Sequence, residues 1–495
     1  VDMSYVNPRY HGRLVLVPRV RNAFAEIYVS QKPRGAIENL LAASEPSRTL
    51  YQLNEFGAQE GEGDLFNFPF LFHRDGRPWF EANSYLLNHV RHKPLVGRPI
   101  DDVRRRASKL LDYLTFCEDE ALDWLDFSGR RPALRPTYKY FAHLVNEGKR
   151  SAAVINQFTG VVFDFYKYVA ANWHDIDIER VDSVKKVQFL FKGSFGSKLI
   201  TAEKRSQTKS TPASSPVPIG FVREDGEDLR PLANVELGEL LGMLKGKGWT
   251  VQQRLILLTA LMTGARKQTV LTMRLKHLNS FTEGNLLNDG TYLMRAGPGT
   301  GMDTKRDRSQ QLYLPSQLVE ELKVMANSPA AAKRRSKLRS HFEKEYPELP
   351  ALDEGDMYVF LSDQGGCYYM AKDDPRYPMI KSRPTGQVTD TITRKLLVKA
   401  SDKFPKSFSY HWLRATYAFQ LYQHLLPLLA SGQIRPGEEI SFIQHRLHHK
   451  NREMTEHYLK LFKMHSEKFA AQELYEEVLF RFGSYEDLKL ETLDE

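Results

Sequence analysis

The chain has 495 residues, which at about 150 residues per domain suggests about three domains. It carries 70 basic and 61 acidic residues, a net charge of +9, and this balance favours a polyanionic partner. The two cysteines are too few for a disulfide framework or a cysteine-rich zinc module, and no apolar run reaches the roughly 18 residues of a membrane span.

The first stretch of the chain mixes short aromatic strands with turns. Residues 65–72 alternate phenylalanine with smaller residues, and the Asp75-Gly76 dipeptide that follows is typical of a hairpin turn. We expect residues 1–99 to form a small extra α+β module. Binding to DNA, for example to arm sites, is a candidate role that composition alone does not decide.

From residue 101 the apolar spacing becomes helical. One helical face is formed by Val103, Ala107, Leu110 and Leu114. A second helix is expected near Ser151, with apolar residues on one face as far as Val169. We therefore predict a compact helical domain over residues 100–190. Its exposed positions are rich in Arg and Lys, which is typical of a phosphate-binding face and equally of a solvated charged face.

Residues 191–227 contain a run poor in large apolar groups and rich in Ser, Thr, Pro and Lys, which indicates an interdomain linker. A helix around residues 235–244 then opens a larger domain, expected over residues 228–465. The tail, residues 466–495, holds nine acidic and three basic residues. It contributes −6 to the net charge and leaves +15 on the rest, so we expect the tail to lie off any bound DNA.

An apolar helix is expected to end at Thr263-Gly264, and a second helix to begin at once with Arg266. Glycine suits the left-handed conformation that follows a helix. An arginine at a helix start can grip a phosphate through two parallel hydrogen bonds. By itself, such a residue is more often a surface arginine.

A β-hairpin is predicted from residues 291–295 and 310–314, with Lys305 in its connecting turn. A flexible lysine there can donate a proton to a leaving oxygen. Arg306 and Arg308 are rivals for any phosphate contact. The glycines of this turn are not followed by the Gly-Lys-Ser/Thr of a phosphate-binding loop, which excludes that type of nucleotide site.

Two histidine-containing segments follow. His411 and Arg414 are three residues apart on a predicted helix, so both can point at one phosphate. Later, Leu447-His448-His449 precedes Tyr458, which lies nine positions beyond His449 on another predicted helix. A helical tyrosine is usually a core or interface residue, so the neighbours of Tyr458 must carry any catalytic role.

Taken in this order, the Thr-Gly-Ala-Arg turn, the hairpin lysine, the H-x-x-R pair and the histidine nine residues before a tyrosine resemble the signature of the tyrosine recombinases, or phage integrases. The resemblance covers residues 229 to about 463, and the preceding helical domain is similar to the family's core-binding domain. It implies a nucleophile, two arginines, two histidine positions and a hairpin lysine, which correspond to Tyr458, Arg266, Arg414, His411, His449 and Lys305.

The chain departs from the family's pattern in three places. Thr269 stands where an acidic residue often follows the first arginine, and His448 replaces the usual glycine before the second histidine. The stretch between Arg414 and His449 is longer than usual. Spacing to Tyr458 favours His449 over His448 as the residue that faces the phosphate, and both stay open.

The resemblance implies a multidomain, mainly α protein with small β-sheets, a helical core-binding domain and a mixed α/β catalytic domain. It also implies cleavage of DNA through a 3′-phosphotyrosyl intermediate, with Lys305 as the general acid. Neither ATP, metal nor other cofactor is required. A type IB topoisomerase and a DNA-binding relative without catalysis are the alternatives.

The implied partner is double-stranded DNA with specific recombination sites, bound by a homotetramer on two sites. The segment 469–482 can dock on a neighbouring subunit, which we favour, or fold back on its own domain. Integration or excision of a mobile element is the expected role, and DNA-bending or directionality proteins are possible accessory partners. We expect a cytoplasmic, nucleoid-associated protein of prokaryotic or phage origin, with no membrane partner.

Overall fold

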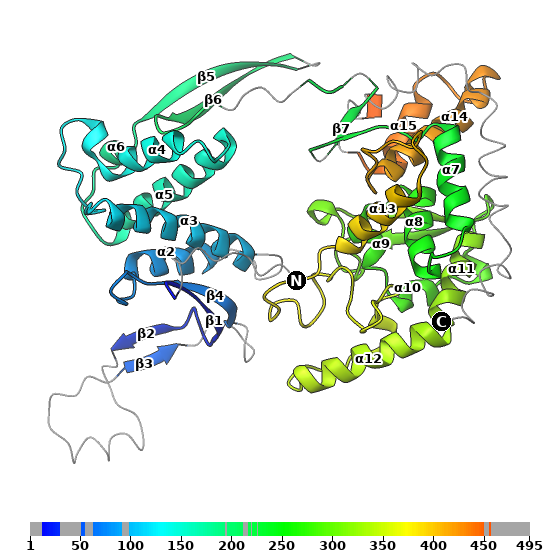
Figure 1. The fold of residues 1–495 in the computed structure, drawn as a ribbon, viewed down its shortest axis with the longest axis horizontal. Coiled ribbons are helices and arrows are strands. Elements are labelled where there is room, and N and C mark those ends of the chain that lie inside the picture. The colour runs from blue at the N-terminus through cyan, green and yellow to red at the C-terminus, as the bar shows by residue number, and fades with distance from the viewer. Residues whose placement is uncertain are drawn as a thin grey trace, which may run out of the picture. The chain divides into compact units, whose positions relative to one another are not determined.

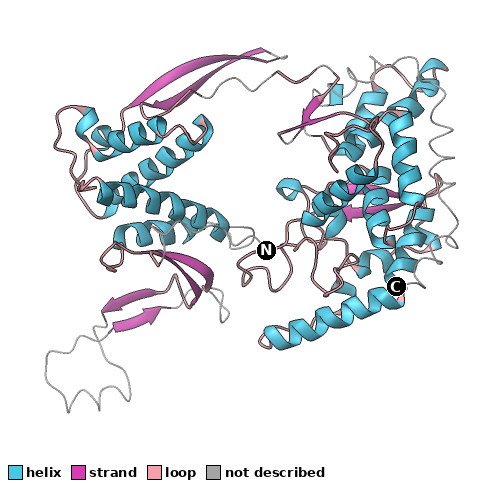
Figure 2. Ribbon diagram, viewed as in Figure 1, coloured by secondary structure: helices cyan, strands magenta, loops and turns pink. Residues whose placement is uncertain are grey.

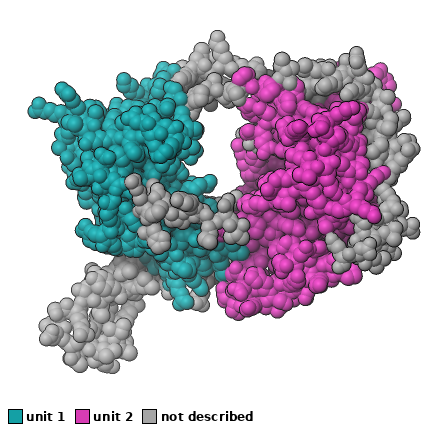
Figure 3. All heavy atoms as spheres, in the orientation of Figure 1, with its two compact units in different colours: residues 1–215, 378–381 teal, residues 216–377, 382–495 magenta. Residues whose placement is uncertain are grey.

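The computed structural model describes residues 12–29, 51–54, 63–91, 99–193, 196–210, 216–218, 220–224, 226–449 and 455–456. The chain divides into two compact units (Figure 3). The first comprises residues 1–215 with 378–381, and the second comprises residues 216–377 with 382–495. Tyr458 and the acidic tail, including residues 469–482, lie outside the described residues.

The first unit combines helices with two-stranded antiparallel sheets (Figure 1). Its strands are β1 (Leu14–Val20), β2 (Glu26–Val29), β3 (Tyr51–Asn54), β4 (Leu65–Leu71), β5 (Val184–Gly193) and β6 (Gly196–Arg205). Its α-helices are α2 (Phe80–Arg91), α3 (Pro99–Asp119), α4 (Pro136–Asn146), α5 (Ala152–Asn172) and α6 (Ile178–Val181).

Both helices that the sequence predicts in this unit are confirmed as α3 and α5. The predicted apolar face of α3 is buried, with Val103, Ala107 and Leu110 at 0% exposure. Ser151 caps α5 by accepting a hydrogen bond from the backbone N–H of Val154. The amphipathic spacing therefore identifies the helices that form the core of this unit.

Described residues from the first 99 positions share a core with these helices. Trp79, just before α2, is fully buried and packs edge-on against Phe165 of α5, with ring centroids 5.1 Å apart. One cluster of buried residues includes Phe24, Leu65 and Trp79 together with residues of α3 and α5 and, at its far end in sequence, Val181. The expected boundary after residue 99 thus falls inside one hydrophobic core, because the short strands have too little apolar surface to form a core alone.

The aromatic strand β4 pairs antiparallel with β1, more than 40 residues earlier in the chain. The turn at Asp75-Gly76 is present, with Gly76 at φ +86°, and it joins Phe72 to Pro78 through an isolated bridge. The dipeptide therefore predicts the turn correctly. The main partner of β4 is distant in sequence and was not predicted.

The expected linker, residues 191–227, is partly built into strands. β5 and β6 form a long hairpin with a register from Val184↔Arg205 to Gly193↔Gly196. The C-terminal end of the expected linker contains β7 (Val222–Glu224) and the start of β8 (Glu227–Leu229), which pair antiparallel. Neither hairpin was predicted from the polar composition of this segment, because the side chains of solvent-exposed strands need not be apolar.

The second unit is mostly helical, with two-stranded sheets formed by β7 and β8 and by β9 (Thr291–Ala296) and β10 (Gln310–Pro315) (Figure 2). Its α-helices are α7 (Asn234–Lys245), α8 (Val251–Thr263), α9 (Lys267–Leu271), α10 (Leu275–Asn279), α11 (Ser316–Asn327), α12 (Pro329–Glu345), α13 (Gln387–Lys399), α14 (Trp412–Ala430) and α15 (Glu438–Leu447). The predicted fold class, mainly α with small β-sheets, is confirmed. No helix among the described residues is long and apolar enough to cross a membrane.

Helix α8 is the centre of the second unit. Its residues Leu255, Ile256 and Leu257 are at most 1% exposed, and the helix packs against α14, α11 and β10. Burial of a leucine side chain contributes about 1.5–3 kcal/mol to folding. The buried α8 thereby gives a rigid base to the loops at its C-terminal end.

Candidate active site

The first arginine of the site follows a sharp turn at the end of α8. Gly264 has φ +65°, and a Cβ atom there would lie 2.5 Å from Cδ1 of Tyr417. Glycine is required for both reasons. Arg266 is the N-cap residue of the short helix α9, as the sequence predicts. The turn thus aims Arg266 away from α8 and into the site.

The second arginine, Arg414, lies in the first turn of α14 and is 4% exposed. Its Nη1 donates to the carbonyl of Gly264 at 2.7 Å, and its Nη2 donates to the carbonyl of Leu447 at 2.5 Å. The guanidinium therefore joins the ends of three helices, α8, α14 and α15. Two carbonyl acceptors hold it in one orientation.

The hairpin lysine lies in the turn between β9 and β10, in a short 3-10 segment over Lys305–Asp307. The turn is tied to α9, because Thr269 Oγ1 donates to the carbonyl of Asp303 at 2.9 Å. Lys305 lines the same cavity as Arg266. Arg306 and Arg308, its rivals in the sequence, do not line that cavity.

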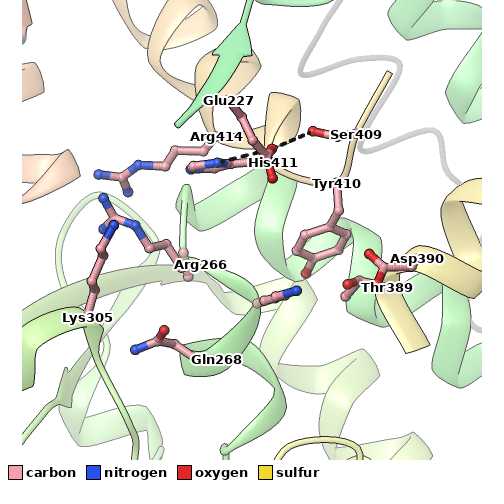
Figure 4. Close-up of a pocket in the computed structure, with 12 residues that line it drawn as sticks. Glu227, Arg266, Gln268, Lys305, Thr389, Asp390, Ser409, Tyr410, His411 and Arg414 are labelled. Carbon is pink, nitrogen blue, oxygen red and sulfur yellow. Dashed lines mark hydrogen bonds and ion pairs between the residues drawn. The ribbon is translucent and has the colours of Figure 1, made fainter. Parts of the chain in front are cut away.

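This cavity has a volume of about 250 Å³ and gathers four of the predicted residues on its walls: Arg266, Lys305, His411 and Arg414. Figure 4 shows the charged ends of the two arginines and the lysine converging, with the imidazole of His411 beside Arg414. The three-residue step from His411 to Arg414 thus places both on one wall. Although Glu227 and Asp390 also line the cavity, the cations on its walls are suited to bind an anion.

His411 is oriented by two residues that the sequence did not single out. Its Nδ1 lies 3.7 Å from Oε2 of Glu227, and Ser409 Oγ donates to the same oxygen at 3.1 Å. The nearby His411 holds the pKa of Glu227 below its ordinary value. Nε2 of His411 is buried and has no hydrogen-bond partner within the described part of the chain. That nitrogen is available to a ligand oxygen.

The side chains of the two adjacent histidines after α15 contact different elements. His448 takes the left-handed conformation, with φ +55°, and its Nε2 donates to the carbonyl of Gln311 on β10 at 3.0 Å. His449 is 8% exposed; its Nε2 lies 3.9 Å from Oε1 of Glu224, and its Nδ1 lies 3.1 Å from Oγ1 of Thr455. The structure thus places His449, not His448, next to the carboxylate that the two arginines share.

Both histidines are electrically neutral near pH 7. Burial, with a smaller contribution from Arg414, lowers the pKa of His449 to about 3. Burial also lowers the pKa of His448 to about 4, although its hydrogen bond to Gln311 acts in the opposite direction. A neutral imidazole can donate one hydrogen bond to a phosphate oxygen without adding charge.

Glu224, the last residue of β7, is the other residue that sequence reasoning missed. Its side chain is fully buried and forms ion pairs with both Arg266 and Arg414. Burial alone would raise its pKa, but Arg414 and Arg266 more than offset this and hold the pKa well below the ordinary glutamate value. Glu224 and Glu227 both fall in the expected linker. The Asp225-Gly226 dipeptide between them was the available hairpin signal.

The arrangement suits the binding of a phosphate group. Arg266, Lys305, His411 and Arg414 line one cavity from α9, the β9–β10 turn and the start of α14. His449 lies next to Glu224, the carboxylate that pairs with both arginines. Among the described residues, no group of three or more His, Cys, Asp or Glu side chains could hold a metal ion. Tyr458 lies outside the described residues, three positions after Thr455.

No protein-family model matches the chain, and no curated protein matches its sequence. Among solved structures, the chain is similar to the XerH site-specific recombinase bound to a palindromic difH substrate, at 14% identity over 79% of this chain and 88% of that chain, with a TM-score of 0.37. It is also similar to the Tn1549 transposon integrase in complex with transposon right-end DNA, at 13% identity over 79% of this chain and 99% of that chain, with a TM-score of 0.36. A lambda integrase dimer bound to a COC′ core site is similar at 14% identity over 77% of this chain and 94% of that chain, with a TM-score of 0.37. These similarities are distant.

Proposed function

We propose that this chain is a tyrosine recombinase, which cleaves and rejoins DNA at specific sites through a covalent bond to Tyr458. One observation carries the proposal: Arg266, Lys305, His411 and Arg414, which are spread over about 150 residues of sequence, line a single cavity. These residues come from three separate elements, α9, the β9–β10 turn and the start of α14, so proximity in sequence does not explain their meeting.

The cavity would hold the phosphodiester that is cut. Transfer of a phosphoryl group requires mainly positioning and stabilisation of charge on the non-bridging oxygens. Arg266 and Arg414 would donate to these oxygens, and Nε2 of His411 would add a further hydrogen bond. Because Arg414 is already fixed by two carbonyls, it needs little reorganisation when DNA binds.

Tyr458 would be the nucleophile. Thr455, three positions earlier, is fully buried and contacts His449, so the chain enters the neighbourhood of the site shortly before the tyrosine. A free tyrosine has a pKa near 10, so its hydroxyl must lose its proton as it attacks. In that step the Tyr458 oxygen forms a bond to phosphorus, and the bond from phosphorus to the deoxyribose 5′-oxygen breaks.

Lys305 would supply the proton that the departing 5′-oxygen needs. The products are a 3′-phosphotyrosyl protein and a free 5′-hydroxyl. Because the phosphodiester energy is kept in the tyrosyl ester, a 5′-hydroxyl from a partner strand can reverse the step without ATP. Paired reversal on two sites would exchange strands and integrate or excise a mobile element, which a homotetramer could coordinate.

The first unit would bind the same DNA. Arg105 on α3 and Lys185, Lys186 and Lys204 on the β5–β6 hairpin are exposed cations suited to phosphate contacts. Other basic residues of this unit are already neutralised: Arg150, for example, pairs with Asp112 at 3.0 Å. We therefore assign DNA contact to the exposed cations of this unit rather than to its whole basic content.

The proposal is tested with a pool of nicked, random-sequence DNA duplexes. Cleavage close to a nick releases a short fragment that carries the 5′-hydroxyl, so rejoining fails and a detergent-stable protein–DNA adduct accumulates. Wild type should form adducts, and sequencing the trapped DNA should recover one preferred site. Tyr458→Phe should form none. Adducts with the phenylalanine variant would contradict the assignment of the nucleophile.

A plasmid that lacks the recovered site separates a recombinase from a type IB topoisomerase. The recombinase should leave its supercoils intact, while a topoisomerase would relax them rapidly. Rapid relaxation of that plasmid would refute the proposed site-specific function and leave the tyrosine chemistry standing.

A further inference from the structure

The cluster of two arginines in the second unit is organised around one carboxylate oxygen. Oε1 of Glu224 accepts from Nη2 of Arg266 and, at 3.3 Å, from Nε of Arg414. Nε2 of His449 lies 3.9 Å from the same oxygen. A single atom thus fixes the spacing between three side chains that come from α9, α14 and the segment after α15.

Glu224 is itself held rigidly. It ends β7 and pairs in register with Glu227 of β8, next to a cross-strand ion pair in which Arg223 grips Asp228 at 2.7 and 2.8 Å. Val222 and Leu229 of the same hairpin are 4% and 0% exposed. The backbone that carries Glu224 is therefore anchored on both strands.

The carboxylate of Glu224 also offsets the electrostatic repulsion between the two arginines. Two guanidinium groups that meet in a largely buried site repel each other, and desolvation increases the cost. Glu224 reduces the charge of the trio with Arg266 and Arg414 to +1, which one phosphodiester would neutralise. Since a guanidinium has five N–H donors, contact with Glu224 through one nitrogen is compatible with donation to a phosphate through another.

We propose that Glu224 is a positioning residue of the site, which sets the distance and orientation of Arg266 and Arg414 for a bound phosphate. Its side chain is fully buried and is not part of the cavity wall that Arg266 and Arg414 line. It would act through the arginines and would not touch DNA. The inference rests on the proposed function.

Thr269 does not perform this task. It is 1% exposed, and its hydroxyl is used to hold the carbonyl of Asp303 in the hairpin turn. The negative charge beside the first arginine therefore comes from β7, more than 40 residues earlier in the chain, and not from the helix that Arg266 begins.

The test compares Glu224→Gln and Glu224→Asp with wild type in the full chain, using the nicked random-sequence duplex pool. The initial rate of adduct formation at saturating DNA and the half-saturating DNA concentration are measured. Since misplacement of a catalytic group by about 1 Å can cost about 100-fold in rate, we expect that loss for Glu224→Gln. The half-saturating concentration should stay within about threefold.

Glu224→Asp keeps the charge but withdraws the carboxylate by one methylene, so we expect a loss of about tenfold. Asp228→Asn is the matched control, because it removes a carboxylate that pairs with an arginine in the same hairpin but outside the site. This control should cleave within about twofold of wild type. Circular dichroism and a melting curve establish that each variant is folded.

Several results would overturn the inference. If Glu224 merely filled the place of the phosphate, Glu224→Gln would bind DNA more tightly and cleave at least as fast as wild type. An equal loss in Asp228→Asn would show that hairpin integrity alone matters. If Glu224→Gln does not fold, a folded Glu224→Asp with the wild-type rate decides against the inference. Failure of the wild type itself to form adducts would instead overturn the proposed function.

Discussion

The two β-hairpins of the second unit give charged residues to the same site in opposite ways. The β7–β8 hairpin has strands of three residues and supplies Glu224, whose side chain is fully buried between two arginines. The β9–β10 hairpin has strands of six residues and presents Lys305 in its connecting turn. The first fixes other side chains, while the second delivers a cation to the cavity wall.

The backbone of each hairpin fits its task. In the β9–β10 turn, Arg306 and Asp307 both have positive φ, at +59° and +52°, a conformation that costs of order 1–3 kcal/mol for each such residue. Lys372 compensates by donating to both carboxylate oxygens of Asp307, at 2.6 and 2.7 Å. The short β7–β8 hairpin has no comparable run of positive φ among its described residues.

The adjacent histidines connect this pair of hairpins to α15. His448 donates to the backbone of β10, and His449 lies against Glu224 of β7. Two neighbouring residues can reach different hairpins because His448 takes the left-handed conformation, which reverses the chain after the helix. The β7–β8 hairpin thus contributes a fixed anion, and the β9–β10 hairpin carries the lysine that we propose as the proton donor.

The largest effect is expected for the lysine. Because general acid catalysis typically contributes 10²–10⁴-fold, Lys305→Ala should slow adduct formation at least about 100-fold and change DNA affinity little. A substrate with sulfur in place of the bridging 5′-oxygen should restore most of the rate, since a thiolate leaves without a proton. Single-turnover kinetics on the recovered DNA site measures both.

Arg306→Asn is the matched control for the lysine, because asparagine tolerates the positive φ of that position. It should cleave within a few-fold of wild type. A wild-type rate in Lys305→Ala, or equal rescue of both variants by the sulfur substrate, would move the general acid to another residue.

The next effect concerns one glycine from the connecting turn of each hairpin, Gly297 between β9 and β10 and Gly226 between β7 and β8. A Cβ on Gly297, at φ +120°, would lie 2.7 Å from the backbone oxygen of Arg308, whereas one on Gly226, at φ +87°, would meet nothing within 4 Å. Gly297→Ala should destabilise its hairpin by about 2–4 kcal/mol, and Gly226→Ala its own by about 1 kcal/mol. Hydrogen exchange of the two hairpins, followed by mass spectrometry, measures the difference. Equal losses of hydrogen-exchange protection in the two variants would contradict this. They would show that the strain of the positive φ, and not the contact of the added Cβ with the backbone, determines the destabilisation.

The smallest effect is a pH dependence of stability. The folded pKa of His449, about 3, lies below the unfolded value of about 6.5, so the unfolded chain takes up a proton that the folded chain refuses. The stability that depends on a neutral His449 is therefore complete above pH 6.5 and falls as the pH is lowered towards 3. Between pH 6.5 and 5.5 the loss should be about 1 kcal/mol. His448, whose pKa is lowered to about 4, should add a nearly equal loss, because pH 5.5 lies well above the folded pKa of both histidines.

Urea unfolding at both pH values measures this loss. His449→Gln, which imitates a neutral imidazole, should remove that part of the pH dependence. His143→Gln replaces an exposed histidine of α4 and should leave it unchanged. An unaltered pH dependence in His449→Gln would mean that His449 is accessible to protons in the folded chain.

Much of the site could be predicted from local patterns. The Gly264 turn, the β9–β10 hairpin and the helix that follows His411 are present where sequence placed them, because each depends on neighbours within a few residues. The domain boundaries were harder to predict. Trp79 packs on Phe165 across 86 residues of sequence, a contact that no local pattern records.

The sequence by itself determined which residue types stand at which spacing, and hence that Arg266, Lys305, His411 and Arg414 could serve one phosphate. Only the tertiary structure decided between His448 and His449 as neighbour of the arginines, and only it brought Glu224 from an apparent linker into their midst. The reason is physical. Helix and turn preferences act over a few residues, whereas the need to neutralise a buried charge is met by whichever acidic group the fold brings near.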